Sequence, residues 1–416
     1  AALNYDKWGF QFAFGLVGGG GKCTFNRGLG SFERQVALLP SILQLANNTY
    51  QQQYGIDLGL GSNTPGYSVE SYIHGQQYVF GFQFGSTYKV NENLAVYGGF
   101  RFNYIYNKYE GSISNITVNI NGQNENLYSY LGTKADALAN QALSYQEQAN
   151  NYTRLAQEAT LAGNEQAAQQ YAAAAEQLTK GAQLAQGGAQ AIGGVRSQVA
   201  DRNLDCTQRG WGITPIIGID YRWGKLNLGA RLEFTTHLNI ENDTKVDDTG
   251  LFADGVNTPN DIPGILTVGG CYEILPTWRV MASSHYYFDK DARMDKDKQK
   301  LLSSNTWEWA LGSEYDISDA LTVSAGMQRT KYGLGDGSYL TDMSFTTSSY
   351  SYGFGAKVRV APKVTVEASY FWTNYETFDK EYDQEYSAAG MSATAHNTDQ
   401  FTRTNKVFGV GVNLDF

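Results

Sequence analysis

No stretch of the sequence is apolar for long enough to form a membrane-spanning helix. Such a helix needs about 18 to 20 consecutive apolar residues, and the 416 residues contain no run of this kind. The mean hydropathy of -0.40 agrees with this. Helical membrane spans are thereby excluded. A transmembrane β-barrel is not, since only alternate residues of its strands face lipid.

Proline and positive charge are scarce as well. The chain has 7 Pro against 46 Gly, and 31 basic against 41 acidic residues, which gives a formal net charge of -10. This balance argues against a nucleic acid as partner, because phosphate backbones bind basic surfaces. A soluble chain of this length usually divides into about two or three domains. No linker separates repeated folds here, so we predict one domain over residues 1–416.

What the sequence does have is a period-two alternation of apolar residues, typical of strands with one apolar and one polar face. The chain ends NKVFGVGVNLDF, in which Phe408, Val410 and Val412 share one face and Gly409 and Gly411 the other. The same alternation recurs along most of the chain. We predict about twelve strands, at residues 8–20, 74–89, 93–119, 208–222, 225–241, 263–274, 277–290, 303–317, 319–333, 347–361, 363–377 and 402–416.

The connections between these strands alternate in length. Short ones follow residues 89, 222, 274, 317 and 361, and long ones follow residues 20, 119, 241, 290, 333 and 377. Outer-membrane barrels show this parity, with short periplasmic turns and long extracellular loops, whereas a soluble sandwich has no reason to obey it. Aromatic residues also gather near the expected strand ends, where a membrane interface favours them. They are Trp8, Tyr88, Tyr106, Trp223, Trp278, Phe288 and Trp372.

These patterns predict an all-β fold: a transmembrane antiparallel β-barrel of the cell outer membrane with an extracellular α-helical insertion. The parity places the C-terminus in the periplasm. We interpret the terminal aromatic residue, Phe416, as the signal that the barrel assembly machinery reads.

Three segments resemble the FadL/TodX family of outer-membrane transporters for hydrophobic compounds. They are GLVGGGGKCTFNRGLGSFE, DIPGILTVGGCYEILPTWRVMASSHYYFDKDA and SYSYGFGAKVRVAPKVTVEASYFWTNYETF. The resemblance runs in order across nearly all the strands and is weak in the long loops. The family has fourteen strands and an N-terminal plug. We therefore expect a plug and two strands to precede Ala1, the alternative being a shorter barrel without a plug.

The resemblance implies uptake of long-chain fatty acids or other hydrophobic small molecules, without a cofactor. In the family the ligand is caught at the extracellular loops, enters a lumenal pocket and leaves sideways through a kink in the third strand. If two strands precede Ala1, that strand is residues 8–20. Its Gly9, Gly15 and Gly18 would permit an opening toward the outer-membrane lipid. We interpret the run of four glycines at 18–21 as only a turn into the next loop.

Two long connections are expected to contain helices. Residues 21–72 would form an extracellular loop with a short helix at 31–48, broken at Pro40. Its apolar stripe either caps the barrel mouth or forms an acyl groove, and we favour Leu39, Ile42 and Leu43 as ligand contacts. Residues 127–205 would form an extracellular helical hairpin, because Ala and Tyr recur at sevens and Gly163 interrupts the pattern. This hairpin would meet the other loops or a protein partner, or act as a solvated spacer.

Among the basic residues with inward parity, we assign Arg101 to a ligand carboxylate, which Arg is well suited to bind. Tyr97 and Ile105 would add apolar wall beside it, since an acyl pocket needs both. The structural alternative is that Arg101 pairs with an acidic neighbour such as Glu233.

Other chemistry finds little support in the sequence. Ser283 and His285 share one strand face, but no nucleophile motif surrounds the four His residues. The acidic segments 289–297 and 247–254 lack the spacing of a Ca²⁺ loop. We expect neither an enzyme nor a metal site. Cys23 and Cys206 both flank the extracellular rim and would form a disulfide if their Cα atoms come close enough, whereas Cys271 should be free.

A second function remains open beside uptake: a barrel that does not transport and instead scaffolds an outer-membrane assembly or secretion complex. The long helical insertion favours it. The lining of the lumen would distinguish the two functions. An apolar lining would favour uptake, and a lumen filled with charged pairs would favour the scaffold.

Overall fold

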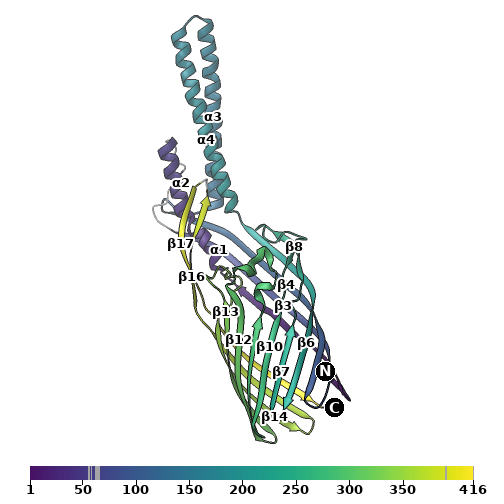
Figure 1. Ribbon diagram of the computed structural model, residues 1–416. Coiled ribbons are helices and arrows are strands. Elements are labelled where there is room, and N and C mark those ends of the chain that lie inside the picture. The colour runs from purple at the N-terminus through teal and green to yellow at the C-terminus, as the bar shows by residue number, and fades with distance from the viewer. Residues whose placement is uncertain (55–56, 58, 61–65, 389–390, 416) are drawn as a thin grey trace.

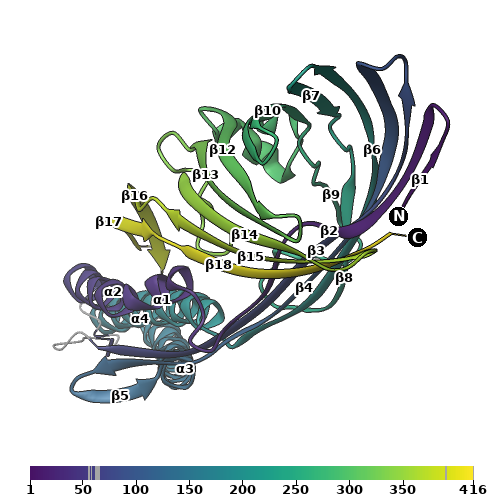
Figure 2. The same cartoon turned by 90° about the horizontal axis from the view of Figure 1, so that it is seen from below.

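The computed structural model describes residues 1–54, 57, 59–60, 66–388 and 391–415. Its main body is one antiparallel sheet that curls around a central lumen (Figure 1 and Figure 2). The ladder joins, in order, β1 (Ala2–Tyr5), β2 (Trp8–Phe25), β3 (Tyr67–Lys89), β4 (Leu94–Ile120), β6 (Arg202–Trp223), β7 (Leu226–Glu233), β10 (Ile265–Leu275), β11 (Trp278–Tyr287), β12 (Ser304–Ser318), β13 (Leu321–Gly333), β14 (Ser349–Ala361), β15 (Val364–Tyr375) and β18 (Thr404–Leu414).

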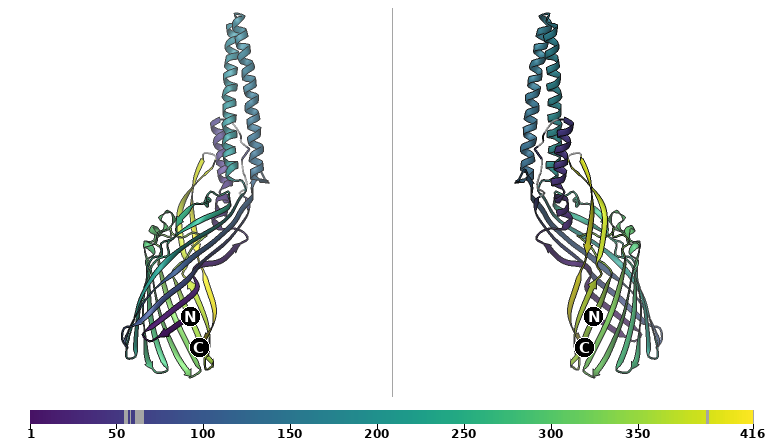
Figure 3. Two further views of the ribbon diagram at one scale, coloured as in Figure 1. Left: turned by 90° about the vertical axis from the view of Figure 1, so that its right-hand side faces the viewer. Right: turned by 90° about the vertical axis from the view of Figure 1, so that its left-hand side faces the viewer.

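All twelve predicted strands are present in this ladder. Each pairs with the predicted strand before it and the predicted strand after it in the sequence, where there is one. The additional β1 pairs with β2. Within the described residues no hydrogen-bonded pairing joins β1 or β2 to β18. The two chain ends nevertheless lie side by side in all views (Figure 1, Figure 2 and Figure 3), so the curled sheet returns almost to its starting edge. Phe416, the predicted assembly signal, lies outside the described residues.

The alternation in sequence becomes an outward apolar face in space. On β2, β3 and β4 the outward positions pair as Phe12 with Phe84 and Phe84 with Phe100, with ring centroids 5.0 and 5.6 Å apart. Large apolar side chains remain exposed on this face, among them Trp211 at 63% and Phe354 at 62%. An exposed apolar band of this extent needs an apolar surrounding, because soluble monomers rarely carry one.

Connections at one end of the sheet are short, and those at the other end carry nearly all the remaining structure (Figure 1). The loop end holds α1 (Gly30–Ala37), α2 (Leu39–Tyr54), β5 (Gln123–Asn126), α3 (Leu127–Leu161), α4 (Glu165–Gln198), β8 (Asn239–Asp247), β9 (Asn257–Pro259), the 3₁₀ turns η1 (Asp289–Asp291) and η2 (Asp295–Leu301), and a separate two-stranded sheet of β16 (Phe378–Ala388) and β17 (Met391–Phe401).

Three of these features differ from the expectation. β2 continues to Phe25 and β3 begins at Tyr67, so both strands extend into the predicted loop 21–72. β7 ends at Glu233, earlier than expected, and the chain then forms β8 across from β6. The segment after β15 forms the β16–β17 hairpin, although its charged, Tyr-containing sequence lacks the apolar alternation that marks a membrane strand.

The helical hairpin is long and thin. Asn126 and Asn164 cap α3 and α4 with side-chain oxygens that accept from Ser129 N and Ala167 N. Gly163, with φ +74°, ends α3 in the left-handed conformation that glycine tolerates. Small residues pack between the helices, with Ala142, Ala149, Ala175 and Ala182 all buried. None of the described helices is long and apolar enough to cross a membrane.

The base of the hairpin is fixed to the sheet by the largest apolar core at the loop end. This core joins α1 and α2 to the ends of β4, α3 and α4, with Leu43, Leu127, Leu131, Ile192 and Val118 each nearly or fully buried. The break between α1 and α2 falls at Leu38, two residues before Pro40, whose missing N–H is tolerated in the first turn of α2.

Candidate functional site: a lumenal cavity and an outward hollow

A buried carboxylate on β7 holds two guanidinium groups on the lumenal face. Glu233 has a side chain that is 4% exposed. One of its oxygens accepts a hydrogen bond from Arg101 Nη2, and the other forms an ion pair with Arg231 Nη2 at 2.8 Å. The Arg101 side chain is 14% exposed and that of Arg231 is 48% exposed. Arg101 is therefore paired inside the wall, and Arg231 is the cation that faces the lumen.

A polar network continues up the wall from this cluster. The Asn103 side chain is completely buried, and its Nδ2 donates to Thr214 Oγ1 at 2.8 Å. Thr214 in turn shares a hydrogen bond with Thr236. The Oδ1 atom of Asn103 and the Nε atom of Arg101 are buried without a hydrogen-bond partner. Ile105, expected to form apolar lumen wall, is instead covered by Leu238 and Ile240.

A cavity of about 600 Å³ opens beside this cluster on the lumenal face. Its lining is mixed and glycine-rich and is drawn from six strands. It includes the polar residues Gln11, Gln83, Tyr97, Asp220, Arg231 and Thr267, together with Val96, Ile219 and Cys271. Of the three residues predicted for the lumenal pocket, only Tyr97 lines the cavity. Its hydroxyl accepts from Gln83 Nε2 at 3.1 Å. A Cβ atom on Gly85 would lie 2.1 Å from that hydroxyl, so glycine makes room for the ring.

Further charged pairs lie on the lumenal face of β11 and β12. Arg279 bonds Glu314 and Asp316, and His285 Nδ1 lies 2.8 Å from Glu308. Within the described residues no hydrogen bond joins Ser283 to His285, and no group of His, Cys, Asp or Glu is arranged to hold a metal ion. The acyl pocket expected around Arg101 and Ile105 is not formed. Arg101 is paired with Glu233, and Leu238 and Ile240 cover Ile105.

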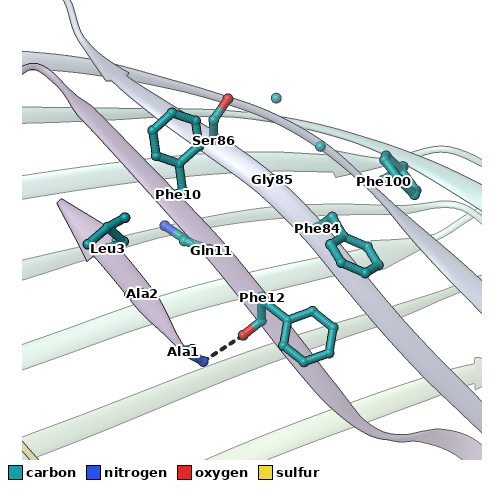
Figure 4. A pocket seen from close by; sticks show the side chains of 12 residues that line it. Ala1, Ala2, Leu3, Phe10, Gln11, Phe12, Phe84, Gly85, Ser86 and Phe100 are labelled. Atoms are coloured by element: carbon teal, nitrogen blue, oxygen red, sulfur yellow. Dashed lines mark hydrogen bonds between the residues drawn. The ribbon is translucent and has the colours of Figure 1, made fainter. Parts of the chain in front are cut away.

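An apolar hollow of about 620 Å³ lies on the opposite, outward face of the same wall (Figure 4). Phe10, Phe12, Phe84 and Phe100 form its sides, with Leu3 at one end. Its floor consists of the small residues Gly85, Ser86, Gly98 and Gly99. Gln11 lines both this hollow and the lumenal cavity. The wall has few side chains of its own where β3 meets β4, because Gly85 pairs with Gly99 and Ser86 with Gly98 there. On the lumenal side the Tyr97 ring covers Gly85 and Gly99.

The ladder of β2 is interrupted above this point. Its register with β3 shifts between Leu16 and Gly18 and again between Gly18 and Gly21. Gly19 has φ +101°, and a Cβ there would lie 2.2 Å from Gln77 O. The glycine run is thus a bulge inside the strand and not the expected turn. Gly9 and Gly15, proposed for the opening, pair regularly with Thr87 and Gly81.

The expected ligand contacts in the first loop are inside protein. Leu39, Ile42 and Leu43 are 9%, 5% and 1% exposed, because they pack into the core at the hairpin base. The stripe is therefore not an open acyl groove. A more polar groove of about 630 Å³ lies alongside, lined by Arg27, Glu33, Pro40, Tyr67 and Val69 among others. Burial and the Glu33 carboxylate raise the pKa of the Tyr67 hydroxyl there.

The expected Cys23–Cys206 disulfide is absent, and all three cysteines are free. Cys23 pairs with Gly75, Gly75 with Tyr109 and Tyr109 with Cys206 across neighbouring strands. Three strand spacings of about 4.8 Å put the two cysteines about 14 Å apart. A disulfide requires Cα atoms within about 7 Å.

Comparison with known proteins found likeness of structure only. No family model and no curated protein sequence matches the chain. A FadL homologue of Pseudomonas aeruginosa is similar with a TM-score of 0.47 and 10% identity, over 84% of this chain and 75% of that one. The toluene transporter TodX of P. putida is similar at 0.45 and 11%, over 100% and 81%. The toluene transporter TbuX of Ralstonia pickettii is similar at 0.44 and 11%, over 99% and 79%.

Proposed function

We propose that the protein lies in the outer membrane and carries small hydrophobic molecules from outside, through the lumen, sideways into the bilayer. The observation that carries the proposal is the pairing of the lumenal cavity with the outward apolar hollow across one wall. Both are lined by Gln11, and the wall between them is built on Gly85, Gly98 and Gly99. A molecule leaving there would pass from a cavity of mixed lining to a surface lined by phenylalanine side chains, and the burial of its apolar part favours that direction.

The ligand class follows from the lining. A cavity with Gln83, Tyr97 and Arg231 suits a compact molecule with one polar end better than a long acyl chain, because these polar side chains interrupt its apolar lining. The Arg231 side chain is half exposed, so it can contact that polar end. Because Arg231 is already paired with Glu233, its attraction for a ligand anion is weakened. The bulge at Gly18–Gly21 supplies flexibility just above the exit.

Filling the outward hollow tests this proposal. A Cβ on Gly98 meets no atom within 4 Å, so Gly98→Trp has room at its base and should occupy the hollow without disturbing the fold. Ala356→Trp, outward on β14 away from the hollow, is the matched control. Cells carrying Gly98→Trp should accumulate a radiolabelled monoaromatic or medium-chain substrate several-fold more slowly than cells carrying the control. Equal rates for both would overturn the lateral route.

A scaffold role is the second candidate, and two observations favour it. The lumen carries several ion pairs, while the hairpin stands clear of the sheet with Leu143 and Leu161 63% and 89% exposed (Figure 3). A variant lacking residues 144–181 keeps the packed base of the hairpin. If it lost a stoichiometric partner in membrane pull-downs yet transported normally, the scaffold role would stand beside uptake. If it lost neither, the scaffold role would be withdrawn.

A further inference from the structure

The outward face of seven consecutive ladder strands carries charge of one sign only. On β10 to β15 and β18, the outward positions hold three charged residues, Arg329, Lys331 and Lys406. All three lie near the loop end, since β13 ends at Gly333 and β18 begins at Thr404. Toward the short-turn end the same face is apolar, aromatic or uncharged.

These three cations are set among exposed aromatic side chains. Lys331 is the cross-strand partner of Trp307, and Arg329 lies between Trp309 and Tyr350 in the register. Lys406 faces Trp372, whose ring centroid lies 6.3 Å from that of Tyr352. Trp and Tyr gather where hydrocarbon meets the headgroups. The cations therefore sit at headgroup depth if the apolar band is in a bilayer.

Arg329, Lys331 and Lys406 form a patch that carries more positive charge than neighbouring acidic side chains neutralise. Arg329 bonds Glu376 at 2.8 Å and stacks over Tyr350 at 4.2 Å, and its Nη1 atom is buried without a hydrogen-bond partner. Lys331 and Lys406 are exposed, and neither forms an ion pair within the described part of the chain. One acid faces three cations, which leaves two charges uncompensated at the edge of an apolar band.

A cation at this depth is costly unless an anion meets it. The long-loop end faces outward in the proposed orientation, and the outer leaflet there is built of phosphorylated glycolipid. We propose that Lys331 and Lys406 bind the phosphate groups of one such glycolipid, of the lipid A type, on either side of the paired Arg329. The aromatic rings around them would pack on its acyl chains. This inference rests on the placement in the outer membrane and is independent of what the lumen carries.

The test is native mass spectrometry of the full chain, reconstituted with lipid A and released from detergent. The Lys331→Gln/Lys406→Gln variant should lose about tenfold in retained lipid A relative to wild type, as the removal of two headgroup contacts predicts. Lys7→Gln/Lys363→Gln, which removes two exposed lysines from the short turns, is the matched control and should retain it. Equal retention by both variants would overturn the proposal.

Two further arms use the wild-type protein and so do not depend on the folding of a variant. Enzymatically dephosphorylated lipid A should be retained about tenfold less than the phosphorylated form, as the loss of the anionic groups requires. Phosphatidylglycerol should also be retained less, because it offers a single phosphate to two separated lysines. Equal retention of either lipid would overturn the proposal. Uptake assays on the same variants separate this result from the transport proposal, since glycolipid loss with normal uptake affects this site alone.

Discussion

Arg101 and Arg231 bind opposite oxygens of the same Glu233 carboxylate, and only Arg231 keeps half of its side chain exposed to the lumen. The carboxylate is almost completely buried, so it depends on both guanidinium groups for its stability, as they depend on it.

Glu233→Gln should therefore destabilise the barrel by about 3–5 kcal/mol, because it leaves two neighbouring cations against one neutral amide. Thermal unfolding followed by the loss of heat-modifiable gel mobility measures this. Glu367→Gln is the control. Its pair with Lys357 is 4.0 Å long and both side chains are about half exposed, so its loss should cost no more than about 1 kcal/mol. Similar losses for the two variants would contradict the buried role of Glu233.

The glycine bulge of β2 offers a second pair of variants. Gly19→Ala should destabilise the protein by about 1–3 kcal/mol, because φ +101° is strained for Ala and its Cβ would meet Gln77 O at 2.2 Å. Gly15→Ala, where a Cβ meets nothing within 4 Å, should be nearly neutral. Denaturant unfolding in detergent compares them. A neutral Gly19→Ala would mean that the bulge is not maintained in solution.

Thiol labelling probes the lumenal cavity directly. Cys271 lines that cavity and Cys206 is fully buried. In a Cys23→Ser background, a small water-soluble maleimide should add one label to the folded protein, at Cys271, and two after denaturation. Intact-mass measurement counts the labels. Protection of Cys271 by a bound substrate would support occupancy of the cavity, whereas an unreactive Cys271 in the folded protein would show that water does not reach it.

A loop clamp around Asp261 predicts pH dependence. The Asp261 side chain is fully buried, accepts from Leu238 N and Arg293 Nε at 3.0 and 2.9 Å, and lies 2.8 Å from His237 Nδ1. Burial raises the pKa of this carboxyl, but the hydrogen bonds from Arg293 and His237 outweigh it, and the pKa lies below the ordinary value. Its stabilisation is complete above the unfolded pKa of about 3.9 and is lost as pH falls through the folded pKa.

Hydrogen exchange in the segment after β11 should therefore rise as pH is lowered below about 4, after correction for intrinsic rates. In Asp261→Asn the exchange should be fast throughout, at a cost of about 1–3 kcal/mol for the unsatisfied donors. Asp291→Asn, on an exposed residue of the same segment, should behave like wild type. An unchanged pH profile in Asp261→Asn would contradict the clamp.

The ladder strands were predictable because each carries its own evidence. Alternation such as Phe10, Phe12 and Phe14 identifies a strand without reference to any other part of the chain, and the connection lengths then order the strands. The helical hairpin was equally local, through its heptad spacing. The hairpin of β16 and β17 was missed because its stability comes from packing onto the loops, with Phe401 buried beside Leu340 and Leu334, and not from its own pattern.

The candidate site was harder to predict for a related reason. The alternation along each strand places Arg101 and Arg231 on the same lumenal face. Which of them is buried beside Glu233 depends on how the strands are paired, and the sequence does not show that pairing in detail. The prediction of ligand contacts in the first loop was wrong for a similar reason. An amphipathic stripe such as Leu39 and Ile42 has the same pattern whether it faces a ligand or a neighbouring helix. For the cysteines the pairing of β2, β3, β4 and β6 was needed, and the order of these strands, which the sequence predicts, would have excluded the bond.

The length of the helical hairpin has a consequence for how the protein meets its surroundings. With 35 residues in α3 at 1.5 Å each, Gly163 stands about 50 Å beyond Leu127. In Figure 1 no other part of the chain reaches as far from the sheet. In the proposed orientation, a large particle that approaches along the hairpin, such as an antibody, touches the turn at Gly163 before it touches the sheet (Figure 1). A small molecule can reach the loop end of the sheet without touching the hairpin (Figure 1). The hairpin tip is therefore a first contact for macromolecules and no obstacle to a small solute.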